Sequence, residues 1–200
     1  MKFEIPFYKQ DNNLDCGIAS LRMVLTYLEK EFTIEEIKNA AGIIEGKGIS
    51  TIKLAIATSK LGFRTKFISK SLYFNEANLD LDFYKKYGDS FLEESKKLIE
   101  DAKNLGIELE EKSIEIKDLI SFVGKSCVVV LLNWNVIKGI AQKGYQGHFV
   151  PVTGYTADSI LIHNPGPLNP EAFMEIGFNL FDKARKSQGT DEDILIVYKK

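Results

Sequence analysis

The sequence predicts an α+β fold, in which helices near the amino terminus pack on an antiparallel β-sheet formed by the second half of the chain. Two patterns predict it. In the first third, apolar residues recur at the three- and four-residue spacing of a helix face. From residue 126 onward, β-branched apolar runs are separated by short polar turns. We expect one domain over 1–200, with a helical part at about 10–62, a variable insertion at about 71–112 and a sheet part at about 126–200.

The first helix is expected at 16–29, with Asp15 as its cap. The apolar side chains that share one face of it are Ile18, Leu21, Val24, Leu25 and Leu28. This face is the part of the helix that we expect to pack on the rest of the protein.

Two shorter helices follow. Thr33 and Glu36 have the spacing of a capping box, which opens a helix that should end near Gly42. A third helix is expected after Ser50 and should stop at Gly62, because glycine most easily adopts the left-handed conformation that ends a helix.

The strands are expected at 63–68 and then in the sheet part. The apolar runs of the sheet part are CVVVLLN, HFVPVTGY, SILIHN and DILIVYK, at 127–133, 148–155, 159–164 and 193–199. A helix is expected around Pro170 to Lys186, before the last strand. The insertion reads as a loop rich in Tyr, Asn and Asp, followed by a charged amphipathic helix from about Ser90 to Asn104.

The composition is that of an ordinary globular protein, with 44% hydrophobic and 27% charged residues among 200. Its 26 basic and 28 acidic residues form no long block of one sign, so nucleic acid is not an expected partner. The amino-terminal MKFEIPFYKQ does not have the pattern of a signal peptide, and no apolar run of 18 residues follows. We therefore expect a cytoplasmic protein with no membrane partner and no cofactor.

Cys16 and Cys127 are the two cysteines, and in a reducing compartment both should be free thiols. Cys16 begins the first predicted helix, where unpaired N–H groups and the helix dipole favour a reactive thiolate and the binding of an oxyanion. Gly17 beside it would leave room for a substrate carbonyl. A cysteine buried under the helix is the alternative. Cys127 opens an apolar strand and fits the role of a small hydrophobic residue.

His148 and His163 are the two histidines. His148 starts a predicted strand after KGYQG and is the better candidate for a general base. Asn164, at the end of the next strand, could accept a hydrogen bond from its imidazole and orient the ring. Cys16, His148 and Asn164 stand in the chain order of a papain-like site. A structural role for a histidine on a strand is the alternative.

The stretch QDNNLDCGIASLRMVLTYLEK, together with HFVPVTGY and LIHNPG, resembles the bacteriocin-processing (double-glycine leader) peptidase family of papain-like cysteine peptidases and its stand-alone members. The resemblance implies a papain-like fold and cleavage of a peptide or protein substrate through a thioester acyl-enzyme. It implies that Gln10 is an oxyanion donor, Cys16 the nucleophile, His148 the general acid and base, and Asn164 the partner that orients it. It does not cover 71–112.

Two features depart from that family. Aspartate is more frequent at the position of Asn164, so a charge that would stabilise an imidazolium is missing. The best-known members are fused to membrane transporters, whereas this sequence has no transmembrane pattern and no GxxxxGK[ST] motif. Cleavage of an exported leader is therefore not implied.

Four alternatives stay open at this point. The domain could be a catalytically inactive peptide-binding module, or an acyl transferase or transpeptidase that passes the acyl group of the thioester to an amine or a thiol. A metal site would need Cys16, Cys127, His148 and His163, which lack CxxC or HxxxH spacing. A nucleotide-handling enzyme would need a phosphate loop, and GIIEGKG at 42–48 lacks the strand before it and the helix start after it.

Aromatic residues that could shape a substrate cleft, or instead belong to the core, are Tyr73, Phe74, Tyr84, Tyr87 and Trp134.

Overall fold

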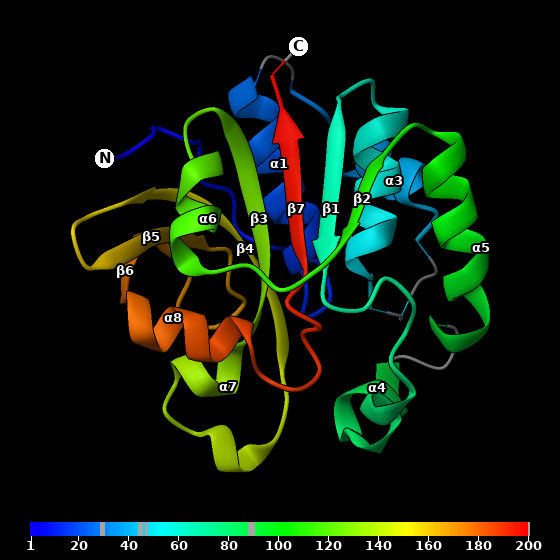
Figure 1. Cartoon of the computed structure of the whole chain (residues 1–200). Helices are drawn as coiled ribbons and strands as arrows, with labels where there is room; N and C mark the ends of the chain where they lie inside the picture. The colour runs from blue at the N-terminus through cyan, green and yellow to red at the C-terminus, as the bar shows by residue number, and fades with distance from the viewer. Residues whose placement is uncertain (29–30, 44–45, 47, 88–90, 200) are drawn as a thin grey trace.

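The computed structural model describes residues 1–28, 31–43, 46, 48–87 and 91–199. Within these residues, one seven-stranded sheet has the order β2-β1-β7-β3-β4-β5-β6 (Figure 1). The strands are β1 (Thr65–Ser69), β2 (Glu108–Glu111), β3 (Ser126–Asn133), β4 (Gly147–Tyr155), β5 (Ser159–Asn164), β6 (Glu171–Gly177) and β7 (Ile194–Tyr198). Only β1 and β2 pair in parallel; the other neighbours are antiparallel. The predicted α+β class is confirmed.

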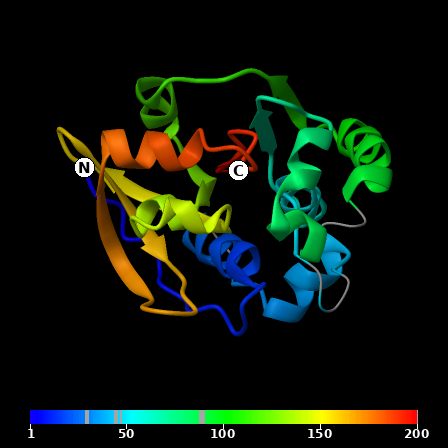
Figure 2. The same ribbon diagram turned by 90° about the horizontal axis from the view of Figure 1, so that it is seen from below.

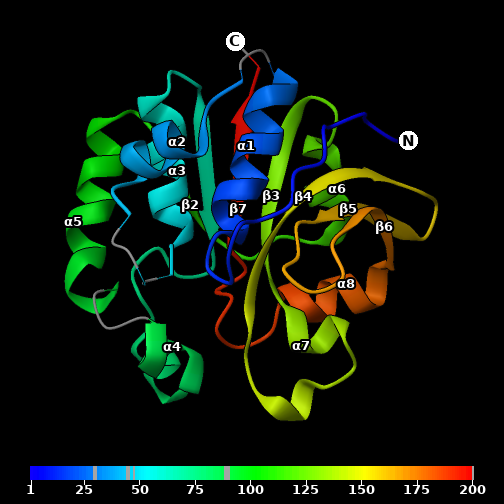
Figure 3. The ribbon, with the colours of Figure 1, turned by 180° about the vertical axis from the view of Figure 1, so that it is seen from behind.

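Helices cover both faces of the sheet. They are α1 (Cys16–Leu28), α2 (Ile34–Ala41), α3 (Thr51–Lys60), α4 (Asp82–Tyr87), α5 (Phe91–Asn104), α6 (Ile116–Phe122), α7 (Trp134–Ile137) and α8 (Phe178–Arg185), with 3-10 turns η1 (Glu76–Asp80) and η2 (Ala141–Lys143). Seen from below, α1 lies on one side of the sheet and α8 on the other (Figure 2). Figure 3 shows α2 and α3 on the side of α1. None of the described helices is long and apolar enough to span a membrane.

Side chains of β3 alternate between two hydrophobic cores. Cys127, Val129 and Leu131 belong to the core under α1, and Val128, Val130 and Leu132 to the core on the opposite face. Successive residues of a strand point to opposite faces of a sheet, so a strand covered on both sides needs apolar residues at every position. This burial explains why the strand reads as a continuous apolar run.

The three predicted amino-terminal helices are confirmed. α1 begins at Cys16, directly after Asp15, whose carboxylate accepts hydrogen bonds from Asn12 (2.6 Å) and Lys38 (2.9 Å). In α2, both hydrogen bonds of the Thr33 capping box are present, and Gly42 adopts the left-handed conformation after the last turn.

The helix predicted around Pro170 to Lys186 is wrong in its first half. Residues Glu171–Gly177 form β6, which pairs along its length with β5, and α8 begins only at Phe178. The partly exposed side chains of this edge strand carry no clear two-residue alternation, so the pairing that makes it a strand is set by β5.

The predicted insertion contributes a strand to the sheet. β2 has the charged sequence ELEE and pairs with β1, where Lys66 lies 2.5 Å from Glu110 and Arg64 lies 2.5 Å from Glu108. Cross-strand ion pairs let an edge strand hold charged side chains that a sequence pattern assigns to a loop. The helix predicted from Ser90 is confirmed as α5 over the part that the structure describes, from Phe91 to Asn104.

The start of α1 is pressed against β4. The Ser20 hydroxyl donates to the carbonyl of Phe149 (3.0 Å), and both residues are buried. A Cβ atom placed on Gly17 would lie 2.9 Å from Ile49 and 3.1 Å from the Phe149 ring. The missing side chain of Gly17 therefore makes room for its packed neighbours, and the clearing of space for a substrate carbonyl stays a prediction.

Gly17→Ala tests this packing. We expect the added methyl group to lower the free energy of unfolding by about 1 to 3 kcal/mol, because overpacking forces neighbouring atoms apart. Gly177→Ala is the matched control, since nothing lies within 4 Å of a Cβ there and the backbone is at a φ of -56°. Urea unfolding should show a change of only about 0.5 kcal/mol in the control. Equal effects of the two substitutions would contradict the packing explanation.

Candidate active site

Cys16 is 8% exposed and lines a cleft. Burial raises the pKa of its thiol to about 11. Hydrogen bonds from the backbone of Phe149, Gly17 and Cys16 itself lower the pKa, but they do not overcome the loss of solvent. The nearby Asp15 carboxylate raises it further. The thiol is therefore neutral at pH 7, and the predicted stable thiolate at the helix start is wrong for this state.

His148 and Asn164 are brought together as predicted. The Nε2 atom of His148 lies 2.9 Å from Oδ1 of Asn164. The Asn164 amide is oriented by its other contacts, because Nδ2 donates to the carbonyl of Asn169 (2.8 Å) and Oδ1 accepts from the amide of Gly166 (3.1 Å). With Oδ1 facing the ring, Nε2 must carry the proton. The Nδ1 atom of His148 is left as an acceptor.

The His148 ring is buried and packs on Trp134, with ring centroids 4.5 Å apart. Burial lowers the pKa of His148 to about 4; the hydrogen bond to Asn164 raises it, and the charge of Lys138 lowers it. The ring is therefore neutral at pH 7 and able to accept a proton.

The thiol and the imidazole are linked through one residue. The backbone of Phe149, which follows His148, hydrogen-bonds the Cys16 sulfur. The hydrogen bonds among the described residues do not include a direct one between the thiol and the ring. The catalytic pair of Cys16 and His148 stays a prediction.

Gln10 ties two loops of the site together. Its backbone N–H donates to the carbonyl of Pro165 (3.0 Å), the residue that follows Asn164 in the chain. Its side-chain Nε2 donates to the carbonyl of Asn12 (2.6 Å), while Oε1 is buried without a hydrogen-bond partner in the described structure. One N–H of the side-chain amide is thus bound to the Asn12 carbonyl, and the predicted role of Gln10 as an oxyanion donor stays a prediction.

The other histidine and cysteine have structural surroundings. His163 accepts at Nδ1 from the amide of Phe173 (3.0 Å), so its Nε2 donates to the carbonyl of Ile5 (2.8 Å). Cys127 is 3% exposed, and burial raises its pKa to about 12. Both cysteines are free. Among the described residues, no group of three or more His, Cys, Asp or Glu side chains is placed to hold a metal ion.

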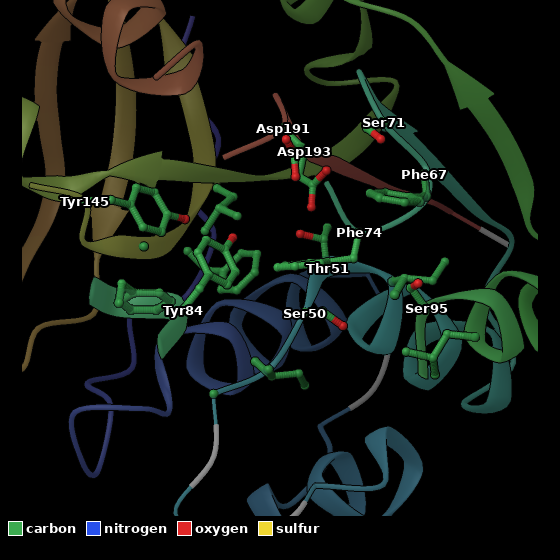
Figure 4. Close-up of a pocket in the computed structure, with 18 of the residues that line it drawn as sticks. Ser50, Thr51, Phe67, Ser71, Phe74, Tyr84, Ser95, Tyr145, Asp191 and Asp193 are labelled. Carbon is green, nitrogen blue, oxygen red and sulfur yellow. The ribbon is translucent and has the colours of Figure 1, made fainter. Parts of the chain in front are cut away.

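The cleft beside Cys16 has aromatic walls (Figure 4). The aromatic residues that line it are Phe67, Tyr73, Phe74, Phe83, Tyr84, Tyr145 and Phe149. Of the aromatic residues singled out from the sequence, Tyr73, Phe74 and Tyr84 are therefore at the cleft, whereas Trp134 packs on His148. The side chain of Tyr87 lies outside the described part of the structure. The cavity volume of this cleft is about 100 Å³.

Sequence reasoning missed two acidic residues of the cleft, Asp191 and Asp193. They flank Glu192 in the turn before β7, and burial raises the pKa of Asp193 to about 7. Asp191 and Glu192 both have positive φ, 45° and 56°, which is unusual for residues other than glycine. The run of three acidic residues before an apolar strand was the available signal, and it reads equally well as a solvated turn.

The fold resembles solved peptidase domains. A C39-like peptidase from Bacillus anthracis has a TM-score of 0.60 at 15% identity, covering 98% of this chain and 96% of that one. The peptidase domain of Streptococcus ComA, a bifunctional ABC transporter, has a TM-score of 0.55 at 13% identity, covering 98% and 100%. A double-glycine-motif protease from an AMS/PCAT transporter, solved with its leader peptide, has a TM-score of 0.55 at 19% identity, covering 100% and 94%. The predicted papain-like peptidase fold is confirmed.

Sequence comparison points to a different family name. Guanylyl cyclase 1 of Arabidopsis thaliana is 24% identical over 209 residues, which cover 97% of this chain and 75% of the plant protein. Residues 5–197 match the guanylylate cyclase family, nearly the whole chain. The resemblance to leader peptidases thus holds for the fold, and by its sequence the chain belongs to the guanylylate cyclase family.

Proposed function

We propose that this protein is a cysteine peptidase-like hydrolase that cleaves a peptide or amide bond with Cys16. The observation that carries the proposal is the hydrogen bond of 2.9 Å between His148 and Asn164. The residue after His148 on β4, Phe149, hydrogen-bonds the Cys16 sulfur through its backbone. Together these contacts support an imidazole held in one tautomer on the strand that contacts the thiol, and the approach of its Nδ1 atom to the sulfur is part of the proposal. The cytoplasmic location and the peptide or protein substrate are part of the proposal and rest on the sequence.

The first step is attack by a thiol that loses its proton during the reaction. Because burial keeps both Cys16 and His148 neutral, a stable thiolate–imidazolium pair is not the starting state. The Nδ1 atom of His148 takes the thiol proton as the sulfur bonds to the substrate carbonyl carbon. Asn164 holds the ring through Oδ1 while it is protonated. The ring then gives the proton to the leaving amine, and a thioester remains.

The oxyanion of the intermediate is stabilised by N–H groups at the start of α1. The backbone N–H of Cys16 is the first donor, and the side chain of Gln10 is the second. Gln10 would turn one N–H from the Asn12 carbonyl to the substrate. Water, activated by His148, hydrolyses the thioester; an amine in its place would give a transpeptidase from the same residues.

Substitution of the reacting groups tests the proposal. We expect Cys16→Ala and His148→Ala to lower kcat/KM by about 10³-fold or more, because the two groups act as a unit. Asn164→Ala should lower it less, since the ring keeps its base but loses its fixed tautomer. Cys127→Ala is the matched control and should leave turnover unchanged. The readout is mass spectrometry of a peptide library after incubation, and full cleavage by Cys16→Ala would disprove thiol catalysis.

The pH dependence should reflect a neutral pair. The base is active when His148 is unprotonated, so kcat/KM should rise with a midpoint near pH 4 and stay level until the thiol ionises near pH 11. An acid limb near pH 6.5, the ordinary value for histidine, would mean that the ring is solvated in the working enzyme. The measurement is initial rate at low substrate concentration, over the pH range in which circular dichroism shows the folded protein.

Alkylation by iodoacetamide distinguishes a neutral thiol from an ion pair. At pH 6 to 7 we expect Cys16 in the folded protein to react at least about 100-fold more slowly than a free cysteine, because little thiolate is present. His148→Ala should not change the rate. Peptide mass spectrometry measures both thiols, with the urea-unfolded protein as the control in which both react at the ordinary rate. Fast labelling of Cys16 that depends on His148 would establish a thiolate–imidazolium pair instead.

The family match favours a second candidate, the conversion of GTP to cyclic GMP. In that reaction the ribose 3′-hydroxyl attacks the α-phosphorus, pyrophosphate leaves and a base takes the hydroxyl proton. Lys or Arg side chains and divalent cations usually neutralise the phosphates in such reactions. The described cleft residues include no Lys or Arg, so phosphate charge there would have to be neutralised through a divalent cation held by the acidic pair, Asp191 and Asp193. The cleft therefore supports this candidate less well than thiol chemistry.

Incubation with GTP separates the two candidates. GTP with Mg²⁺ or Mn²⁺ is added to the wild-type protein and to Cys16→Ala, and cyclic GMP is measured by chromatography and mass spectrometry. We expect none from either protein. Cyclic GMP formed equally by both would replace the peptidase proposal, because no step of cyclisation uses the thiol.

A further inference from the structure

The cleft that holds Cys16 also contains an acidic pair without a cationic partner among its described residues. Asp191 and Asp193, which are labelled in Figure 4, are both partly exposed, and Cys16 lines the same cleft. Asp191 accepts a hydrogen bond from Asn78 (2.9 Å), and the charge of Lys70 acts on it from outside the cleft lining. Asp193 and Cys16 share the cleft lining. The charge that acts on Asp193 is that of Asp191, which repels it and raises its pKa.

Two hydroxyl groups of the cleft lining, those of Thr51 and Ser50, make no hydrogen bond of normal geometry within the described structure. Figure 4 shows the side chain of Thr51 next to Asp193 in the cleft. Thr51 is 1% exposed; its hydroxyl and that of Ser69 interact with the Asp193 carboxylate and lower its pKa, although the Thr51 Oγ1 makes no hydrogen bond of normal geometry within the described structure. The buried hydroxyl of Ser50, also in the cleft lining, has no partner either. Buried polar groups left unpaired are rare, and a ligand with several N–H donors would satisfy this set.

The turn that carries the two carboxylates is fixed by contacts with Arg185. Arg185 is fully buried, and its guanidinium lies 3.5 Å from Glu192, between the two aspartates in the chain. The Thr190 hydroxyl donates to the carbonyl of Arg185 (2.6 Å). These contacts keep Asp191 and Glu192 at positive φ, a conformation that costs free energy and persists only where surrounding structure enforces it.

Aromatic rings form the neighbouring wall of the cleft. Tyr84 and Tyr145 are stacked with ring centroids 5.6 Å apart and an interplanar angle of 5°, and Phe83 packs edge-on against both. The Tyr84 hydroxyl donates to the carbonyl of Gly189 (2.5 Å), which fixes the ring beside the acidic turn. Aromatic faces attract guanidinium and ammonium groups, most strongly where water is excluded.

We propose that this acidic, aromatic cleft is a specificity pocket for a cationic side chain, lysine or arginine, of the peptide whose carbonyl is attacked by Cys16. The pocket deepens the proposed peptidase function and rests on it. The guanidinium or ammonium donates to Asp193 and to the hydroxyl of Thr51, and its alkyl stem lies along the rings of Tyr84 and Phe74. A neutral or acidic side chain would leave these polar groups unpaired or repel them.

Matched peptides test the preference. The wild-type protein should cleave an arginine peptide at least about 10-fold faster, in kcat/KM, than the same peptide with citrulline, and a lysine peptide faster than its norleucine analogue. Asp193→Asn should reduce this preference to about 2-fold or less, as measured by the ratio of kcat/KM for the two peptides within the same variant. Glu175→Gln removes a charge from the exposed surface of β6 and is the control; the preference should remain. Equal cleavage of arginine and citrulline peptides by the wild-type protein would overturn the proposal.

A binding measurement separates failure of the pocket from failure of the catalytic proposal. Butylguanidine and its uncharged analogue butylurea are titrated into the wild-type protein by calorimetry. We expect butylguanidine, and not butylurea, to bind to the wild-type protein, even if no peptide is cleaved. Its affinity for the wild-type protein should be at least about 10-fold higher than its affinity for Asp193→Asn. Equal binding of the two compounds, or binding of GTP in place of butylguanidine, would overturn the pocket whether or not Cys16 cleaves peptides. Thermal unfolding of Asp193→Asn checks that it is folded, and the wild-type comparison does not depend on it.

Discussion

The contact between the start of α1 and β4 is the constraint on which the rest of the site depends. Gly17 lets the helix approach until a Cβ would touch the Phe149 ring, and the Ser20 hydroxyl bonds to the carbonyl of Phe149. The same close approach brings the backbone of Phe149 to the Cys16 sulfur. A side chain at position 17 would move the helix and the thiol together. One packing contact thus joins the hydrophobic core to the position of the Cys16 thiol.

Burial at this contact also decides the charge state of the site. A helix start favours a thiolate, and the backbone hydrogen bonds to Cys16 do lower its pKa. Loss of solvent has the larger effect and leaves the thiol neutral, just as it leaves His148 neutral. In the proposed reaction, the proton therefore moves during the attack on the substrate. Asn164 suits this chemistry, because it orients the neutral ring through a hydrogen bond without requiring a permanent positive charge.

Family and fold point to different activities. The sequence belongs to a family named for guanylylate cyclases, whereas the solved structures that share the fold are peptidase domains. A fold supports many reactions, so the activity must be argued from the side chains of the site. Here the cleft contains a thiol, two carboxylates and aromatic rings, with no Lys or Arg among its described residues. From that set we propose acyl chemistry on a cationic substrate.

The sequence by itself determined the α+β class, the start of α1 at Cys16, the capped helix at Thr33 and the strands that carry His148 and Asn164. These features follow from local rules, because helix spacing, capping pairs and β-branched runs act over a few residues. It also identified the residues that meet in the hydrogen bond of His148 to Asn164, through the motif that they belong to.

Tertiary structure alone decided the rest. β2 and β6 are strands because β1 and β5 pair with them, and the roles of Asp191 and Asp193 appear only when the turn before β7 reaches the cleft beside Cys16. The ionisation of Cys16 likewise depends on how much solvent the packed helix excludes, which no local pattern records. Sequence determined which groups are present and their local structure; packing determined their neighbours and their charge.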